Sequence, residues 1–261
     1  MSKPKRHHFI PKFYINNWNN SKGLVIIYLK GTTPRTLEVQ SKDICFEKNL
    51  YTKRKGRVDI EVNFFGYIDG NASRVIKILL DTGIDSLDRT NKEHFSLFIN
   101  TLHARSSEFI KMLRDFNLKR LQKNIQLPLE IMQDNYDDSP SYIEYHAKGK
   151  DYNKIVESHW HIFENTTEHD FITSDFPLNV YELGGPDKHG VELPDEFLMT
   201  LPISPKKVLI VTNNKDKIKL FIKSPNDFIR KINEATISRA NEIIISLDRN
   251  SEEFILKRIS S

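Results

Sequence analysis

The stretch TNKEHFSLFINTLHARSSEFIKMLRDF, residues 90–116, decides the fold class because it carries a long helical pattern. Its apolar residues recur every three or four positions, so they line one stripe of a helix: Phe95, Phe98, Ile99, Leu102, Phe109, Leu113 and Phe116. Thr90, with Glu93 three residues later, predicts a capping box at its start. We therefore expect one long helix that runs from Thr90 to about Gln122.

The regions on either side of this helix have different patterns. Residues 1–58 are expected to be β-rich, residues 59–160 helical, and residues 160–261 a mixture of strands and helices. No internal repeat or low-complexity tract separates them, so residues 1–261 are predicted to form a single domain. The expected fold class is α+β, with β-rich ends around a central helical region.

Individual elements can be placed within these regions. The apolar, β-branched run 24–29 predicts a buried strand, and residues 35–39 alternate as an antiparallel return would. Residues 60–81 have helical spacing, and Pro225 is placed to open a further helix that reaches about Ser238. The terminal segment 254–259 is predicted to be a strand.

The composition sets limits on the compartment. The chain has 261 residues and one cysteine, Cys45, so it has no internal disulfide and fits a reducing environment. No apolar segment follows the basic start in the way a signal peptide requires, and no run approaches the length that spans a bilayer. We expect a cytoplasmic protein with no membrane partner.

Positive charge is concentrated near the N-terminus. The net charge is +4, but residues 1–60 hold 13 Lys and Arg against 4 Asp and Glu, a balance of 13 − 4 = +9. The other residues therefore carry 4 − 9 = −5. A basic segment attracts phosphate groups, so nucleic acid is an expected partner. The alternative is a solvated surface that is rich in lysine.

The motif HHFIPKFY, residues 7–14, places two imidazoles among aromatic and basic residues. Histidine has an ordinary pKa of about 6.5, which suits proton transfer near neutral pH. His7 and His8 are therefore candidates for a general acid or base, or for metal ligands. The alternative is a structural turn in which the histidines have no chemical role.

Arg105 lies on the apolar stripe of the predicted central helix, three residues after Leu102 and four before Phe109. A buried guanidinium needs an acceptor, because an unpaired buried charge costs several kcal/mol. The acceptor is either a structural carboxylate or a phosphate or carboxylate of a ligand, which arginine binds in a bidentate manner.

The motif FITSDFP, residues 171–177, reads as a strand that ends in a polar turn. Asp175 at such a strand end could orient a histidine, bind a metal or accept a proton. The alternative is an Asx turn, in which the carboxylate of Asp175 accepts hydrogen bonds from local backbone amides. No GxSxG pattern surrounds Ser174, so the sequence gives little support to acyl transfer.

Other metal and nucleotide signatures are weak or absent. His159 and His161 would share one face of a strand, with Trp160 on the other, but zinc sites need three or four ligands. The sequence contains no P-loop, no GxGxxG, no CxxC and no HExxH pattern. Walker-type nucleotide hydrolysis, dinucleotide redox chemistry and structural zinc are therefore disfavoured.

Several motifs together resemble a known family. The segments 7–14, 46–52, 171–177 and 201–205, with the helical Arg105, are similar to those of domain-of-unknown-function family 4238, found mainly in bacteria. The likeness runs from about residue 6 to residue 245. It implies that the motifs belong to one site, and it carries over as residues to test His7, His8, Arg105, Ser174 and Asp175.

The leading functional hypothesis is an enzyme that cleaves a phosphodiester, a nuclease of the toxin or phage-defence kind. In this hypothesis His8 is the general acid or base, Asp175 orients it or holds a metal, and Arg105 clamps the phosphate. The catalytic assignments are His7, His8 and Asp175, and the substrate-binding assignments are Arg105, Ser174, Lys12 and Tyr14. The basic residues expected to attract the polyanion are Lys3, Lys5, Arg6 and Lys12.

Other hypotheses fit the same residues. The first alternative is a non-catalytic binding module that holds a nucleic acid or an anionic ligand. A second is an enzyme that acts on another substrate in an apolar pocket beside Arg105 and Asp175. The last is a structural role for all the motifs. The cofactor is unknown, with a divalent metal as one option, and the sequence predicts no oligomeric state.

Overall fold

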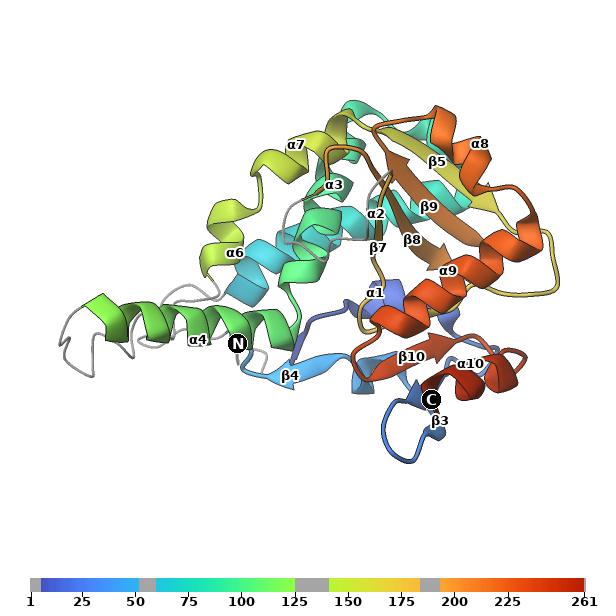
Figure 1. Cartoon of the computed structure of the whole chain (residues 1–261), viewed down its shortest axis with the longest axis horizontal. Helices are drawn as coiled ribbons and strands as arrows, with labels where there is room; N and C mark the ends of the chain where they lie inside the picture. The colour runs from blue at the N-terminus through green and yellow to red at the C-terminus, as the bar shows by residue number, and fades with distance from the viewer. Residues whose placement is uncertain (1–5, 52–59, 125–140, 184–192, 261) are drawn as a thin grey trace.

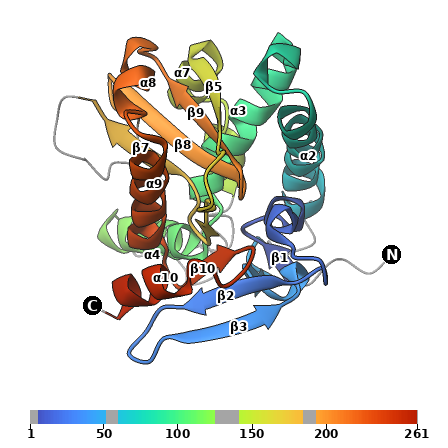
Figure 2. The same cartoon turned by 90° about the vertical axis from the view of Figure 1, so that its right-hand side faces the viewer.

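The computed structural model describes residues 6–51, 60–124, 141–183 and 193–260. Within these residues the chain folds as helices packed against antiparallel sheets, which confirms the α+β prediction (Figure 1). Figure 2 shows the two larger sheets one above the other, with α9 on one side and α2 and α3 on the other. None of the described helices is long and apolar enough to cross a membrane.

The lower sheet joins the two ends of the chain. Its order is β3-β2-β10-β6, and its strands are β2 (Val25–Leu29), β3 (Arg35–Val39), β6 (Thr173–Ser174) and β10 (Ile243–Ser246). The predicted strand at 24–29 and its antiparallel return are confirmed as β2 and β3. Val25 and Ile27 pack into the main core, whereas Ile26 and Tyr28 pack into a second cluster, so β2 is buried on both faces.

The upper sheet has the order β5-β9-β8-β7 and is antiparallel throughout. Its strands are β5 (His159–Glu164), β7 (Asn179–Glu182), β8 (Phe197–Ser204) and β9 (Lys207–Thr212). One face of β8 and β9 packs into the main core through Met199 and Leu209. The other face packs with Phe228 and Ile232 of α9.

A two-stranded ribbon of β1 (Arg6–His8) and β4 (Phe46–Lys48) carries the N-terminal histidines. The strands are antiparallel, and Arg6 pairs with Lys48, His7 with Glu47 and His8 with Phe46. A short helical segment follows β1 as α1 (Lys12–Ile15) and η1 (Asn16–Trp18), and η2 (Ser41–Asp43) precedes β4.

The helices gather mainly in the central region, as predicted. Their bounds are η4 (Glu61–Phe65), α2 (Gly66–Asp81), η5 (Ile84–Ser86), α3 (Arg89–Ala104), α4 (Ser107–Asn124), α6 (Ser141–His146), α7 (Lys150–Glu157), α8 (Asp216–Phe221), α9 (Pro225–Arg239) and α10 (Glu252–Ile259). The helix predicted to open at Pro225 is confirmed as α9. The strand predicted at 254–259 is wrong, because α10 packs Ile255 and Ile259, four residues apart, onto the second cluster.

The predicted long central helix is wrong, because it breaks into α3 and α4 after Ala104. Ser106 caps the second helix: its Oγ accepts the N–H of Phe109 at 3.1 Å. Phe116, which the stripe assigned to the core, is 62% exposed on α4. The capping box at Thr90 is also wrong, since Asp88 Oδ1 accepts the N–H of Asn91 and so caps α3 two residues earlier.

Candidate functional site on the N-terminal ribbon

The two histidines of the ribbon face opposite ways, because successive side chains of a strand alternate. His7 is fully buried, and its ring stacks on Tyr51 with a centroid distance of 5.6 Å. Its Nδ1 accepts the backbone N–H of Tyr51 at 3.0 Å. His7 therefore fixes the segment that follows β4, on the inner side of the ribbon.

Arg105 also lies on the inner side, at the break between α3 and α4. Its guanidinium is fully buried and binds both carboxylate oxygens of Asp69, at 2.6 and 2.9 Å. It also lies 4.4 Å from the ring centroid of Phe65. Burial opposes the charge of Arg105, but the Asp69 carboxylate outweighs burial, so the pKa of Arg105 is raised. The structural carboxylate, one of two acceptors that the sequence left open, is the acceptor present here.

The same guanidinium ties the helices to the ribbon. Arg105 Nη2 donates to the carbonyl of His8 at 3.5 Å, and Tyr51 Oη donates to the carbonyl of Arg105 at 2.6 Å. Because Phe65 and Asp69 are four residues apart, both face Arg105 from the junction of η4 and α2. We name this set the arginine cluster: His7, Tyr51, Phe65, Asp69 and Arg105. Asp69 occupies both Nη groups of Arg105, so a phosphate would have to replace Asp69 to bind those two groups in a bidentate manner.

The other end of the HHFIPKFY motif is anchored in the core. Tyr14 Oη donates to the carbonyl of Pro202 at 2.5 Å and shares a hydrogen bond with Thr173 Oγ1 at 2.8 Å. Complete burial raises the pKa of the Tyr14 hydroxyl well above its ordinary value. Tyr14 thereby connects α1 to β6 and β8, and it has no exposed surface for a substrate.

Asp175 holds the segment that leads into β10. Its Oδ1 accepts the N–H of Asn241 at 2.9 Å, and its Oδ2 accepts those of Glu242 and Ile243 at 2.7 and 3.0 Å. Burial raises the pKa of Asp175 to about 6, although these three hydrogen bonds act in the opposite direction. The carboxylate therefore satisfies distant backbone amides, whereas an Asx turn would satisfy local ones.

Ser174 makes the local turn. Its fully buried Oγ accepts the N–H of Phe176 at 3.1 Å. Trp18 reinforces this region, since its Nε1 donates to the carbonyl of Phe171 at 2.9 Å. The FITSDFP motif is thus held by hydrogen bonds to its own backbone, to η1 and to the segment before β10.

The outer side of the ribbon is different, because it is charged and open. Since Arg6 pairs with Lys48 and His8 with Phe46, these four side chains share one face, which we name the ribbon face. Arg6 and Lys48 are exposed, and His8 and Phe46 are half-buried. The guanidinium of Arg6 lies 4.6 Å from the centroid of the Phe46 ring. Lys12 is exposed nearby, and its charge reaches His8.

His8 has a fixed orientation on the ribbon face. Its Nε2 lies 3.2 Å from the carbonyl of Lys42, which can only accept, so Nε2 carries the proton. Nδ1 is then unprotonated in the neutral ring, and no hydrogen bond reaches it within the described part of the chain. Burial, then the charges of Lys12, Arg6 and Arg105, lower the pKa of His8, against the hydrogen bond to Lys42.

The structure thus gives the residues that the sequence grouped different hydrogen-bond partners. It brings the backbone of His8 to Arg105, but the hydrogen bonds of Asp175 go to residues 241–243 instead. The partners Asp69, Phe65 and Tyr51 were missed as site residues. The spacing of Phe65 and Asp69 in a predicted helix was the available signal, but it did not identify Arg105 as their target. Lys3 and Lys5 lie outside the described residues.

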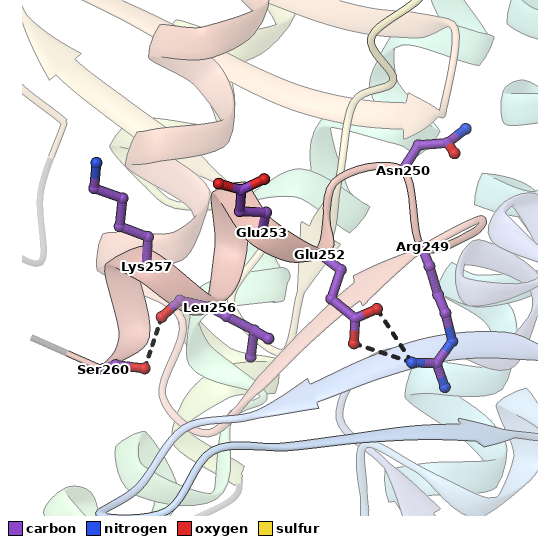
Figure 3. A pocket seen from close by; sticks show the side chains of 7 residues that line it. All are labelled: Arg249, Asn250, Glu252, Glu253, Leu256, Lys257 and Ser260. Atoms are coloured by element: carbon purple, nitrogen blue, oxygen red, sulfur yellow. Dashed lines mark hydrogen bonds and ion pairs between the residues drawn. The ribbon is translucent and has the colours of Figure 1, made fainter.

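Other surfaces carry less chemistry. His159 and His161 lie on the outer side of β5 with Trp160 inward, as predicted, and the described residues include no group of three or more metal-binding side chains. A shallow hollow lies beside α10 (Figure 3). There Arg249 pairs with Glu252 at 3.0 Å, and Ser260 donates to the carbonyl of Leu256. None of the predicted site residues lines it.

Fold and site define an α+β protein in which a buried arginine cluster supports a basic, two-stranded ribbon. The chain matches the model of DUF4238, described as a protein of unknown function, over residues 6–250. The chain therefore belongs to the DUF4238 family, which confirms the resemblance seen in its motifs. No curated protein and no solved structure shows a significant match to it.

Proposed function

We propose that the chain binds a phosphate-bearing polyanion, specifically a nucleic acid, on the ribbon face. The observation that carries the proposal is the register that aligns Arg6 with Lys48 and His8 with Phe46 on one open side. Phosphate contacts by Arg and Lys supply most of the affinity of nucleic-acid binders. The excess of positive charge in residues 1–60 acts in the same direction.

The cations of the ribbon face are free to exchange partners. Arg6 binds Asp43 at 3.0 Å, but both side chains are about half exposed, so the pair contributes less than about 1 kcal/mol. A phosphate can therefore replace Asp43. An aromatic ring among basic side chains suits a single strand, whose unstacked bases pack on aromatic side chains. Phe46 occupies that position beside Arg6 and His8.

The first prediction removes the two exposed cations. Arg6→Ala with Lys48→Ala should weaken binding to a single-stranded oligonucleotide. It should also make the slope of log K against log salt shallower by about 1.4, because each lost phosphate contact on a single strand removes about 0.7. Fluorescence anisotropy over a salt series measures both quantities.

A matched control removes two exposed lysines elsewhere: Lys219→Ala in α8 is combined with Lys223→Ala, two residues after that helix ends. Both double variants lose the same charge. The proposal predicts that the control keeps the affinity and salt slope of the unaltered chain. Equal losses in both variants would mean that the attraction is general and that the ribbon face is not the binding site.

The second candidate function is cleavage of the bound phosphodiester, favoured by the orientation of His8. With Nε2–H donated to Lys42, the Nδ1 lone pair is available as a general base, and the lowered pKa favours the neutral ring in the free chain. In this form of the hypothesis Arg105 positions His8 through its carbonyl, and Asp175 anchors the surrounding fold. The metal requirement is open, so Mg²⁺ and EDTA are compared in every assay.

His8→Ala should slow cleavage of RNA or DNA by about 10²–10⁴-fold, which is the usual contribution of a general base. His161→Ala is the matched control, because burial also lowers the pKa of His161 but it lies on β5. Cleavage by the His8→Ala protein at the original rate would rule out His8 as the base. If the unaltered chain binds the oligonucleotide but does not cleave it, the cleavage hypothesis fails and only the binding function stands.

A further inference from the structure

Helix α4 carries an exposed face that the ribbon does not use. The face consists of six side chains at helical spacing: Glu108, Lys111, Met112, Asp115, Phe116 and Lys119. Met112 and Phe116, one turn apart, are 49% and 62% exposed, so they form a contiguous apolar patch on this face. Figure 1 shows α4 projecting at the left, away from the sheets, with α6 above it.

The opposite side of α4 is already occupied by the rest of the chain. Leu113 is buried, and Arg114 Nη2 donates to the carbonyl of Leu50 at 3.1 Å. At the start of the helix, Glu108 accepts a hydrogen bond from Asn241 at 3.0 Å. These contacts fix α4 on the body and turn Met112 and Phe116 outward.

We propose that this face binds the same face of a second copy of the chain, with the two α4 helices antiparallel. In a two-fold pair each residue meets one that lies equally far on the other side of the axis. A two-fold axis on the outer side of α4, at the height along the helix that lies midway between residues 113 and 114, places Glu108 opposite Lys119 of the second copy. It places Met112 and Phe116 of both copies side by side at the centre.

The charges favour this occupant. Around the apolar centre, Lys111 of each copy lies next to Asp115 of the other, and Glu108 of each copy lies next to Lys119 of the other. The two-fold symmetry therefore forms each of these two ion pairs twice. The face has two acidic and two basic side chains, so its net charge is zero. A polyanion therefore gains little here, whereas a second copy in the antiparallel direction pairs all four charges.

The size of the face sets the strength of the dimer. It covers three turns of a single helix, which is less than the area that specific, stable interfaces bury. We therefore expect reversible association between micromolar and millimolar concentrations of the chain. Sedimentation velocity of the whole chain over that range should show a sedimentation coefficient that rises with concentration.

Charge reversal tests the pairing. Lys111→Glu alone and Asp115→Lys alone should each weaken self-association at least tenfold, because each puts like charges together twice. A mixture of these two variants should associate as well as the unaltered chain, because each then meets its complement in the other. Both positions are exposed, so we expect both variants to fold, and circular dichroism checks this.

Three outcomes would overturn the proposal. The unaltered chain could stay monomeric up to millimolar concentration, or the single variants could associate as strongly as it does. The mixture could also fail to recover association. Because the ribbon face is unchanged in these variants, oligonucleotide binding measured on the same samples separates this proposal from the proposed function.

Discussion

Asp69→Ala is expected to destabilise the fold by roughly 3–5 kcal/mol, the usual cost of stranding a buried charge. Asp69 is the carboxylate that binds both Nη atoms of the fully buried Arg105. Without Asp69, the remaining contacts of the Arg105 guanidinium would be the carbonyl of His8, at 3.5 Å, and the ring of Phe65. Unfolding of the chain in guanidinium chloride, monitored by circular dichroism, measures the change in the free energy of unfolding.

A double variant separates charge from packing in the same cluster. Asp69→Leu combined with Arg105→Met replaces both charges with apolar groups, and it should recover much of the lost stability. A loss below about 1 kcal/mol in Asp69→Ala would contradict the account, because Arg105 would then have another adequate acceptor.

Asp175→Ala should cost on the order of 3 kcal/mol, because it leaves three backbone N–H groups without their acceptor. Ser174→Ala is the neighbouring control and should cost about 1 kcal/mol, since it removes one hydrogen bond. The same denaturation assay ranks the two. If the neighbouring substitutions cost the same, Asp175 would not be the anchor of the segment before β10.

The raised pKa of Asp175 adds a pH dependence. Its pKa is about 6 in the folded chain against an ordinary 3.8, because burial disfavours the charged form. The folded state therefore holds the proton to higher pH than the unfolded state. The contribution of Asp175 to stability is greatest below pH 4 and falls as the pH rises towards 6. The side chain in Asp175→Asn cannot titrate. As the pH falls from 7 to 4, the unfolding free energy of the unaltered chain should therefore increase relative to that of the variant.

Much of the fold could be predicted from local patterns. The apolar run at β2 and the proline that opens α9 were sufficient to predict these two elements, because each pattern lies within a few residues of the chain. Local patterns failed where two elements were both plausible. Ser106 interrupts a continuous stripe by capping α4, and Ile255 and Ile259 fit a strand as well as the helix α10.

The site was harder to predict because its partners are distant in sequence. The spacing of Arg105 indicated burial, but the sequence could not identify Asp69 as its acceptor, 36 residues away. Likewise nothing near Asp175 showed that its carboxylate would reach residues 241–243. No strand was predicted at residues 6–8, so the opposite orientations of His7 and His8 could not be predicted, and the packing of His7 on Tyr51 determines which of them is buried.

The most direct test of the ribbon face is the pKa of His8, measured by NMR titration of its imidazole with and without a single-stranded oligonucleotide. In the free chain we predict a pKa below the ordinary 6.5, because of burial and the neighbouring cations. Phosphates bound beside His8 should raise that pKa, while the pKa of His161 on β5 stays unchanged. An oligonucleotide that binds the chain and leaves the pKa of His8 unchanged would contradict the account.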